Sequence, residues 1–416
     1  MIKETTVIVG AGHAAGQAVA SLRQGGYSGR IVLVGDEPHV PYQRPPLSKK
    51  FLAGELDLHR LYFRPEKFYP DHDIDLRLST RAEKIDRAGQ NLLLSDGTNI
   101  HYDNLLLTTG SKVRKMDVPG SDLDGIRYLR SIEDVLSIRQ KFSPGARLVI
   151  VGAGYIGLEV AAVSVSQGIN VTVLEMENRV MKRAVGPAIS DFFAALHRRA
   201  GVDLRFGYRV ESFEGSKSVS TVVCQENERF EADLVIVGVG IRPSVELAER
   251  AGLACDDGIV VDESCVTEDQ HILAAGDCTS HPNAVLGRRA RLESVHSALE
   301  QAKIAAAKIC GSPPPEIHAP WFWSDQYDVK LQIVGLAEGY DQTILRGDPE
   351  SESFAVFYLA NGRLLAVDAV NRPREFMIAK KLVAQGICFR PDDLGDTNKD
   401  FKQLAQQALA AAGEKN

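Results

Sequence analysis

Two glycine-rich runs of the same kind constrain the fold of this chain more than any other feature. The first is VIVGAGHAAG at residues 7–16, and the second is VIVGAGYIG at residues 149–157. In each, an apolar run typical of a buried strand passes through a glycine turn into a helix-forming segment, the arrangement that binds a dinucleotide pyrophosphate. The sequence therefore predicts an α/β fold with two Rossmann-like dinucleotide-binding domains.

An acidic residue follows each run at the spacing expected for binding a ribose. Asp36 ends an apolar stretch 20 residues beyond Gly16, and Glu175 ends another 18 residues beyond Gly157. A carboxylate at such a strand end accepts hydrogen bonds from both ribose hydroxyls and repels a 2′-phosphate. We expect two unphosphorylated adenosine riboses, hence NADH over NADPH, although cations near Glu175 could temper that preference: Arg179, Lys182 and Arg183. The alternative for either acid is a solvated surface charge.

Size and composition limit the class of protein. A chain of 416 residues exceeds what one core usually supports, and a net charge of −7 argues against broad nucleic-acid binding. The first strand is expected from about residue 5, with no room for a signal peptide before it, and no apolar run reaches the length of a membrane span. We therefore expect a cytoplasmic globular enzyme.

The order of apolar runs predicts how the domains follow one another. A strand at residues 105–110 closes the first unit, the second unit opens at Arg147, and a strand at residues 272–277 ending in Gly-Asp returns to the first. From Trp321 the pattern changes to alternating strands followed by two helices. The predicted domains are a first dinucleotide-binding domain at 1–111 and 244–319, a second one at 112–243, and a small α+β domain at 320–416; by the resemblance described below, the first is the FAD-binding domain and the second the NADH-binding domain.

The six cysteines carry information through their spacing. They are scattered, with no CxxC pair and no close metal-ligand spacing, so we expect no metal site. A flavoprotein that reduces disulfides needs a cysteine pair beside the flavin, and one that reduces peroxide needs a reactive cysteine there. Where such a cysteine would follow the second strand, this chain has the segment Arg44-Pro45-Pro46.

Five short runs carry a resemblance to a known family. They are PYQRPPLSK at 41–49, GYIGLE at 154–159, GDC at 276–278, ESV at 293–295 and WFWSDQY at 321–327. With these, the chain resembles the FAD-dependent redoxin reductases, the putidaredoxin-reductase-like group of the oxygenase-coupled ferredoxin reductases, over nearly its full length. The resemblance implies a glutathione-reductase-like fold, FAD and NADH as cofactors, and a [2Fe-2S] ferredoxin as electron acceptor.

The expected FAD site combines physical arguments with the resemblance. Backbone N–H groups at residues 12–15 suit the pyrophosphate, Asp277 would accept a ribitol hydroxyl, and a helix starting near Glu293 would direct its N-terminus at the flavin pyrimidine edge. By resemblance Lys49 and Arg130 also touch FAD; the alternative for both is an exposed cation. The expected FAD contacts are Gly10, Gly12, Ala14, Ala15, Asp36, Arg44, Lys49, Ala82, Arg130, Asp277, Val295 and Trp323.

The expected NADH site centres on the second glycine run. The resemblance places Glu159 beside the nicotinamide, paired with Lys49 next to flavin N5, where the pair would orient the ring and modulate the flavin potential. The alternative is that Glu159 caps its own helix. We name Lys49 and Glu159 as the catalytic pair. The expected NADH contacts are Gly152, Gly154, Ile156, Gly157, Glu159, Glu175, Arg183 and Gly240.

Trp323 and a set of cations are candidates for the partner surface. By resemblance Trp323 approaches the flavin near the ferredoxin docking site, whereas Trp321 is expected in the core. Redoxins are acidic, so a net-negative reductase must localise positive charge. For each cation the alternative is a solvated side chain without a partner. The candidate cations are Arg64, Arg288, Arg289, Arg291 and Lys303.

The function expected from these observations is reduction of a [2Fe-2S] ferredoxin by NADH through FAD, in service of a bacterial cytochrome monooxygenase or dioxygenase. Two alternatives use the same scaffold. One is an NADH-dependent disulfide, peroxide or oxygen reductase, which needs the reactive cysteine missing above. The other is a redox-sensing flavoprotein resembling apoptosis-inducing factor, for which the extra basic or targeting segments are not seen. The identity of the ferredoxin and of the oxygenase, the flavin potential and the oligomeric state stay open.

Overall fold

The computed structural model describes residues 4–413, which form two compact units. The first unit comprises the chain up to Arg44, Asp57–Lys112 and Ile241–Pro320; the second comprises Pro45–Leu56, Val113–Gly240 and the chain from Trp321 onward. The three predicted domains are a finer division whose boundaries stay a prediction, and residues 1–3 and 414–416 of those ranges lie outside the described part. Among the helices of residues 4–413, none has the length and apolar character needed to cross a bilayer.

The first unit is built on a five-stranded parallel sheet with the order β19-β7-β1-β2-β3. Strand β19 pairs with β7, although 164 residues lie between the end of β7 at Leu107 and the start of β19 at Ile272. The chain therefore returns to this sheet after forming other elements. The strands are β1 (Thr5–Val9), β2 (Arg30–Val34), β3 (Ile74–Arg77), β7 (Asn104–Leu107) and β19 (Ile272–Ala274).

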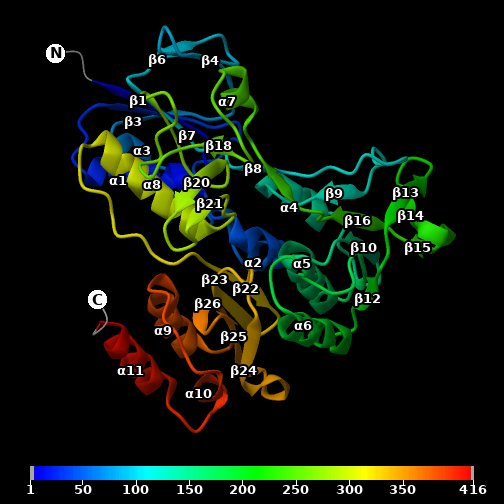
Figure 1. Cartoon of the computed structure of the whole chain (residues 1–416). Helices are drawn as coiled ribbons and strands as arrows, with labels where there is room; N and C mark the ends of the chain where they lie inside the picture. The colour runs from blue at the N-terminus through cyan, green and yellow to red at the C-terminus, as the bar shows by residue number, and fades with distance from the viewer. Residues whose placement is uncertain (1–3, 414–416) are drawn as a thin grey trace. The chain divides into compact units, whose positions relative to one another are not determined.

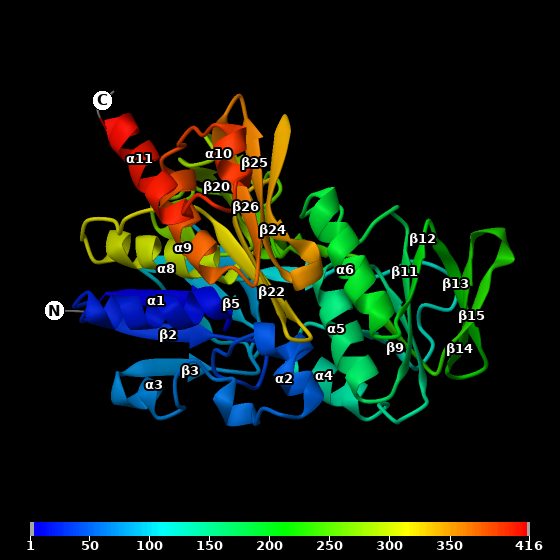
Figure 2. The ribbon, with the colours of Figure 1, turned by 90° about the horizontal axis from the view of Figure 1, so that it is seen from below.

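Both faces of this sheet are apolar, and each is covered. Helices α1 (His13–Gln24) and α8 (Val295–Ile309) lie side by side on one face (Figures 1 and 2), where Ile8 and Leu33 join their core. Val7 and Val32 point to the opposite face, as the two-residue period of a strand requires, and pack with a β-hairpin sheet and α7. The elements of that second layer are β4 (Ala82–Asp86), β5 (Asn91–Leu94), β6 (Asn99–His101) and α7 (Glu246–Arg250).

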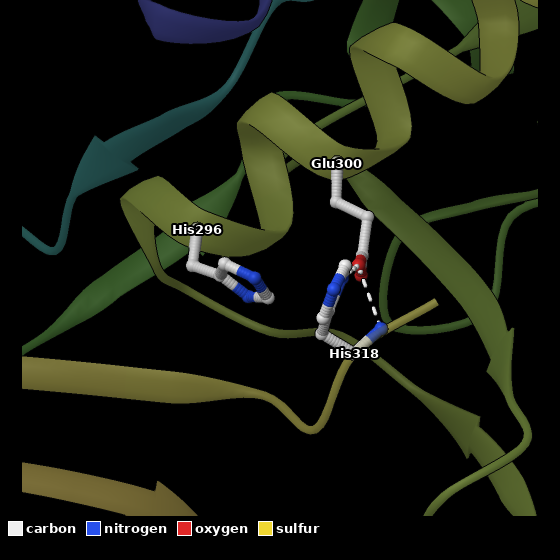
Figure 3. A group of neighbouring side chains, drawn as sticks. All are labelled: His296, Glu300 and His318. Atoms are coloured by element: carbon white, nitrogen blue, oxygen red, sulfur yellow. Dashed lines mark hydrogen bonds and ion pairs between the residues drawn. The ribbon is translucent and has the colours of Figure 1, made fainter. Parts of the chain in front are cut away.

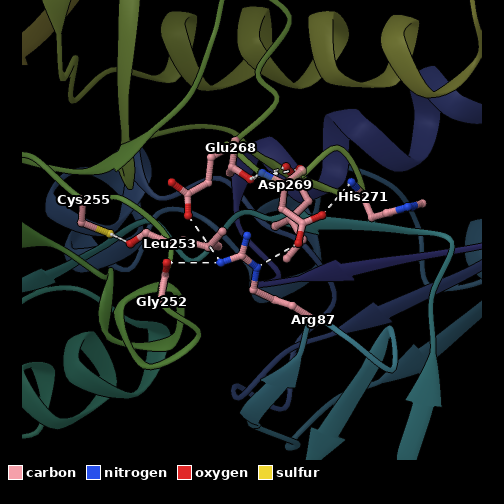
Figure 4. A network of polar contacts seen from close by, with 9 residues as sticks. Arg87, Gly252, Leu253, Cys255, Glu268, Asp269 and His271 are labelled. Carbon is pink, nitrogen blue, oxygen red and sulfur yellow. Dashed lines mark hydrogen bonds and ion pairs between the residues drawn. The ribbon is translucent and has the colours of Figure 1, made fainter.

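A polar network fastens this second layer (Figure 4). The Arg87 guanidinium follows β4 and donates to the carbonyl of Gly252 at 3.2 Å and to Asp269 Oδ2 at 2.9 Å, and lies 3.4 Å from Glu268 Oε1. These bonds hold the hairpin sheet to two loops that come 165 and 182 residues later in the chain. The smaller elements of this part are α3 (Phe68–Asp71), β8 (Ser111–Val113), β17 (Ile241–Pro243), β18 (Ile259–Val260), β20 (Thr279–Asn283), β21 (Arg288–Ala290) and the 3₁₀ turn Leu58–Arg60.

The second unit contains another five-stranded parallel sheet, with the order β12-β11-β10-β16-β9. Its strands are β9 (Ile126–Tyr128), β10 (Arg147–Val151), β11 (Asn170–Glu175), β12 (Asp203–Phe206) and β16 (Leu234–Val237). Its helices are α4 (Ile132–Arg139), α5 (Tyr155–Ser166) and α6 (Pro187–Arg199). An antiparallel sheet packs on it, made of β13 (Val210–Gly215), β14 (Val219–Cys224) and β15 (Arg229–Glu231).

The same unit carries an antiparallel sheet with the order β22-β23-β26-β25-β24. Its strands are β22 (Trp321–Gln326), β23 (Val329–Gly335), β24 (Gln342–Asp348), β25 (Ser353–Ala360) and β26 (Arg363–Val370). Three helices follow instead of the expected two, because the five-residue α10 lies between the longer ones: α9 (Pro373–Ala384), α10 (Pro391–Gly395) and α11 (Phe401–Gly413). The two parallel sheets built on the glycine runs, together with this smaller α+β part, confirm the predicted α/β class.

Candidate active site

The turn between β1 and α1 leaves space where a pyrophosphate would lie. Gly10 has a φ of +108°, and a Cβ there would stand 2.3 Å from the carbonyl oxygen of Thr108. At Gly12, by contrast, a Cβ would meet no atom of residues 4–413 within 4 Å, and no side chain caps the helix that begins after it. Thus the first glycine is required by the protein itself, whereas the second keeps open a space beside uncapped helix N–H groups.

The turn between β10 and α5 repeats this geometry. Gly152 has a φ of +103° and lies against the Gly238 carbonyl, where a Cβ would approach to 2.5 Å. At Gly157 a Cβ would stand 2.2 Å from the Gly152 carbonyl oxygen, so only glycine lets the helix pack this closely on the turn. The position facing Gly154 is again open among the described atoms. Both turns therefore fit a dinucleotide.

The two predicted ribose acids lie at strand ends in different surroundings. Glu175, at the end of β11, accepts hydrogen bonds from the backbone N–H of Ala153 at 2.7 Å and of Glu177 at 2.9 Å, so the glycine turn itself holds the carboxylate. Asp36 is exposed, with Arg81 at 4.0 Å as its ion-pair partner. The Glu175 carboxylate is thus already oriented, whereas that of Asp36 is exposed to solvent.

The cations near Glu175 differ in what they contact. Arg179 donates to the Val185 carbonyl and to Ser190 Oγ, and Lys182 pairs with Glu177 at 2.7 Å. Arg183 is exposed, and its Nη2 lies 3.5 Å from the position of a Cβ on Gly240. Arg183 and Gly240, both expected at NADH, are therefore neighbours, whereas Arg179 and Lys182 are engaged within the protein.

In the first unit, several expected FAD contacts are held by their own neighbours. Arg44 pairs with Glu37 at 2.6 Å and donates to the Tyr42 hydroxyl at 2.9 Å. Asp277 accepts a hydrogen bond from Ser111 Oγ at 2.9 Å. The expected FAD residues of this unit are Gly10, Gly12, Ala14, Ala15, Asp36, Arg44, Ala82 on β4, Asp277 and Val295 at the start of α8. Lys49, Arg130 and Trp323 belong to the second unit.

Within the second unit Glu159 is almost fully buried, with 2% of its side chain exposed, and three side chains donate to its carboxylate. Lys49 Nζ lies 2.6 Å and Ser48 Oγ 2.5 Å from Oε2, and Ser324 Oγ lies 2.6 Å from Oε1. The 3₁₀ turn Pro45–Ser48 and the short helix α2 (Lys50–Ala53) flank Lys49 and position it. The pairing of Lys49 with Glu159 is present as expected, and the carboxylate accepts these three donors instead of capping α5. Its place beside a nicotinamide stays a prediction.

A chain of hydrogen bonds continues from Glu159 into the protein. Gln326 Nε2 donates to Ser324 Oγ at 3.1 Å, and Gln326 Oε1 lies 2.8 Å from His197 Nε2. Burial lowers the pKa of His197 to about 4, so the ring is neutral at pH 7. Since the amide oxygen can only accept, Nε2 carries the proton and Nδ1 accepts from the Tyr327 hydroxyl at 3.1 Å.

Ser48, Ser324, Gln326 and His197 were missed by the sequence reasoning. One signal was available for two of them, because Ser324 and Gln326 are two apart in a strand and so lie on one face of β22, where both are buried. Nothing in the spacing of Ser48 or His197 indicates that they lie near Glu159. Separations of 111 residues for Ser48 and 165 for Ser324 place these contacts beyond local patterns.

A second buried carboxyl lies on β26. The Asp368 side chain is fully buried and its Oδ2 accepts a hydrogen bond from the Tyr358 hydroxyl at 2.6 Å, whereas Oδ1 has no hydrogen-bond partner among the described residues. Burial raises the pKa of Asp368 to about 7, which the bond from Tyr358 only partly offsets. The negative charge of Asp368 also contributes to the raised pKa of Tyr155, whose main cause is burial.

The two tryptophans of β22 lie on the face opposite to Ser324. Their ring centroids are 5.5 Å apart, and Trp321 also packs on Phe376 at 5.7 Å and under Lys380 Nζ at 4.7 Å. Trp321 is half-buried, so the expectation of a core residue is only partly met. Trp323 is half-buried as well, which leaves part of its ring accessible.

Of the candidate partner cations, one is nearly buried in ion pairs and the other four are exposed. Arg291 is not a steering charge, because its side chain is only 12% exposed and pairs with Asp257 and Glu293. Arg289 Nη1 donates hydrogen bonds to the carbonyls of Val261 and Ser280, both at 2.6 Å. The exposed side chains of the set are those of Arg64, Arg288, Arg289 and Lys303, all in the first unit.

All six cysteines fall in the described range and are free thiols. Cys224, Cys265 and Cys278 are buried. Burial raises the pKa of Cys224 and of Cys255 to about 11, and raises that of Cys265 further. Because the thiolate is the reactive form, these thiols are poorly suited to redox catalysis.

Comparison with known proteins assigns nearly the whole chain to two known protein families. Residues 4–302 match the family described as pyridine nucleotide-disulphide oxidoreductase, and residues 321–405 match the family described as reductase C-terminal. Putidaredoxin reductase of Pseudomonas putida is 43% identical, with 98% of each chain covered, and rhodocoxin reductase of Rhodococcus erythropolis is 42% identical, covering 95% of this chain and 93% of the relative.

A solved structure agrees with these sequence matches. The crystal structure of the covalent putidaredoxin reductase–putidaredoxin complex matches with a TM-score of 0.95 and 43% identity, covering 98% of this chain and 99% of that one. The chain therefore belongs to the pyridine nucleotide-disulphide oxidoreductase family, and it is an oxidoreductase. The expected membership of the ferredoxin reductases with a glutathione-reductase-like fold is confirmed.

Proposed function

We propose that this chain is an NADH-dependent flavoprotein that reduces a [2Fe-2S] ferredoxin serving a bacterial cytochrome monooxygenase or dioxygenase. The observation that carries the proposal is the pair of glycine turns, each with an open space at its second glycine and an acid at the neighbouring strand end. Two such turns indicate two dinucleotides, FAD and NADH. The relatives named as putidaredoxin reductase and rhodocoxin reductase support the choice of acceptor.

The residues of the chain would bind and orient the cofactors. Gly10 to Ala15, Asp36, Arg44 and Asp277 would hold FAD, and Gly152 to Gly157 with Glu175 would hold the adenosine half of NADH. When bound, the nicotinamide supplies a hydride to the flavin, which releases two electrons singly. Lys49 and Glu159 hold one another in place, and Ser48 and Ser324 orient the carboxylate where the resemblance puts the nicotinamide.

An anaerobic titration tests the proposal. The purified protein is expected to be yellow, to bleach on addition of NADH, and to regain its colour when an oxidised [2Fe-2S] ferredoxin is added. A colourless protein, or a yellow one that NADH does not bleach, would remove its basis. Bleaching without reoxidation by any ferredoxin would reject the acceptor but keep the NADH-dependent flavoprotein. Placement in the cytoplasm also stays a prediction, tested by fractionation of the native cells.

The rival thiol-dependent reductase is tested separately. Its reactive cysteine would need a thiolate, which burial disfavours at Cys224, Cys255 and Cys265. Replacing the six cysteines, the buried ones by alanine and the others by serine, is expected to leave ferredoxin-dependent cytochrome c reduction intact. Loss of turnover in a variant that still melts like the wild type would favour the rival.

A further inference from the structure

Three metal-ligating side chains of the first unit, none of them assigned above to a dinucleotide, gather beside α8, where His296 directly follows the expected FAD contact Val295 (Figure 3). They are His296, Glu300 and His318, and one ligand atom from each lies within 4.8 Å of the other two. Although the cysteine spacing predicts no metal site, we propose that these residues, none of them a cysteine, form a site for a divalent transition-metal ion of the Zn²⁺ type. The proposal is independent of the assigned function.

The fold brings the three ligands together from two segments. His296 and Glu300 are four residues apart on α8, so they occupy one face of the helix on successive turns. His318 belongs to the segment after α8 that has no regular secondary structure, and its ring lies 6.4 Å from that of His296, centroid to centroid, at an interplanar angle of 81°. In Figure 3 both rings and the carboxylate point into the same space beside the helix.

The Glu300 carboxylate is already oriented for this role. Its Oε1 accepts a hydrogen bond from the His318 backbone N–H at 2.9 Å and lies 3.4 Å from Nδ1 of the same residue. The Glu300 side chain is only 16% exposed, which strengthens its attraction for a cation, and the His318 side chain is 55% exposed, which leaves a route from solvent. A backbone donor that fixes a ligating carboxylate is a common feature outside the ligands of metal sites.

The donor set selects the class of ion. Two imidazole nitrogens and one carboxylate oxygen suit Zn²⁺ with a fourth position open to water, whereas Ca²⁺ and Mg²⁺ prefer oxygen ligands alone. Tetrahedral bonds of about 2.1 Å place ligand atoms roughly 3.4 Å apart, so the side chains must close by up to about 1.4 Å from the present 4.8 Å limit. His318 can do so by side-chain rotation, because it is exposed and lies outside the core.

Titration of the full-length, FAD-loaded protein, with any affinity tag removed, tests the site. Isothermal titration with Zn²⁺ alone is expected to give one saturable site per chain, and Co²⁺ to give the visible bands of a four-coordinate ion at wavelengths beyond the flavin absorption. His318→Ala and Glu300→Gln should each weaken Zn²⁺ binding at least tenfold, whereas the matched control His101→Ala, an exposed histidine on β6, should not.

The His318 variant keeps the test independent of folding, since that side chain is exposed. His296→Ser gives a second check, because serine is small and polar and removes only the third ligand. Absence of a saturable site, or Zn²⁺ binding as strong in the His318 and Glu300 variants as in the wild type, would overturn the proposal and leave Glu300 as the acceptor of a backbone hydrogen bond from His318 that holds the segment to α8. Failure of ferredoxin reduction would not bear on it.

Discussion

At the scale of single residues, the nearly buried Glu159 carboxylate depends on its hydrogen-bond partners. It is 2% exposed, and Lys49, Ser48 and Ser324 supply its hydrogen bonds. Glu159→Gln is expected to lower the free energy of unfolding by roughly 3 kcal/mol, because it leaves the half-buried Lys49 charge without its partner. The same variant should slow reduction of the flavin by NADH in a stopped-flow experiment.

A double-mutant cycle separates the pair from the two single effects. Lys49→Gln combined with Glu159→Gln should destabilise less than the sum of the two single variants, with a coupling free energy of about 1–3 kcal/mol. The exposed pair Arg229 and Glu214 serves as the matched control, since Glu214→Gln removes a solvated ion pair and should change stability little. Strict additivity at Lys49 and Glu159 would mean that their contact is not energetically coupled.

Asp368 predicts an unusual pH dependence of stability. Its pKa rises from 3.8 in the unfolded chain to about 7 in the fold, so the folded state binds the extra proton between these values. Stability from this group is therefore complete below about pH 4 and is lost as the pH rises toward 7. Asp368→Asn keeps an acceptor for Tyr358 and should abolish that loss, so its melting temperature should gain on the wild type between pH 5 and pH 8.

His197 supplies the opposite sign and thus a control. Its pKa falls from 6.5 to about 4, so the unfolded chain binds the extra proton and stability is lost as the pH falls from 6.5 toward 4. His197→Gln should lose less stability than the wild type over that range and behave like it above pH 7. If both variants followed the wild-type pH profile, neither group would titrate as its burial requires.

At the scale of elements, each strand-turn-helix motif contains one kind of glycine that the fold requires and another that a bound ligand would require. Gly154→Ala introduces a Cβ with no protein atom of the described chain within 4 Å, so the melting temperature without NADH should not change. Because the pyrophosphate must approach that position, the Kd for NADH should rise about tenfold or more. Gly152→Ala should fail to fold well, since its φ is +103° and the Gly238 carbonyl lies 2.5 Å from the new Cβ.

A matched control for this pair is Gly395→Ala at the end of α10. There the new Cβ would make only an ordinary contact, 3.5 Å from Ile344, so neither stability nor NADH binding should change. Differential scanning fluorimetry and fluorescence titration with NADH measure both quantities. Gly154→Ala with unaltered NADH affinity would show that the second glycine turn does not hold the coenzyme.

Whether a feature arises from neighbouring or from distant residues explains what the sequence could and could not predict. The glycine turns, the strand-end acids and the alternation at β22 are local patterns, because φ, helix caps and the two-residue period depend on neighbouring residues. The partners of Glu159 are not local, since Ser324 comes 165 residues later and His197 enters only through Gln326. The short α10 was missed because five residues are too few to give a helical period.

At the scale of the whole molecule, the net charge and the local cations have opposite effects on association with a ferredoxin. A chain of net charge −7 repels an acidic ferredoxin at long range, so rapid association requires exposed cations near the docking surface. Arg291 is removed from that set by its partners Asp257 and Glu293, whereas Arg64 and Lys303 are exposed cations of the candidate set. The ionic-strength dependence of ferredoxin reduction therefore reports which charge dominates.

Added salt weakens both the attraction of the ferredoxin to local cations and its repulsion by the net charge. If the attraction dominates, kcat/KM for the ferredoxin falls as salt is added; if the repulsion dominates, kcat/KM rises. We expect a fall. Lys303→Glu and Arg64→Glu should each lower kcat/KM about tenfold at low ionic strength and much less at high ionic strength, with kcat for NADH-dependent ferricyanide reduction unchanged. Lys217→Glu, a charge reversal at another exposed residue, in the second unit, changes net charge by the same amount and should have little effect. Equal effects of the three reversals would mean that only total charge matters, and the partner surface proposed around Arg64 and Lys303 would be wrong.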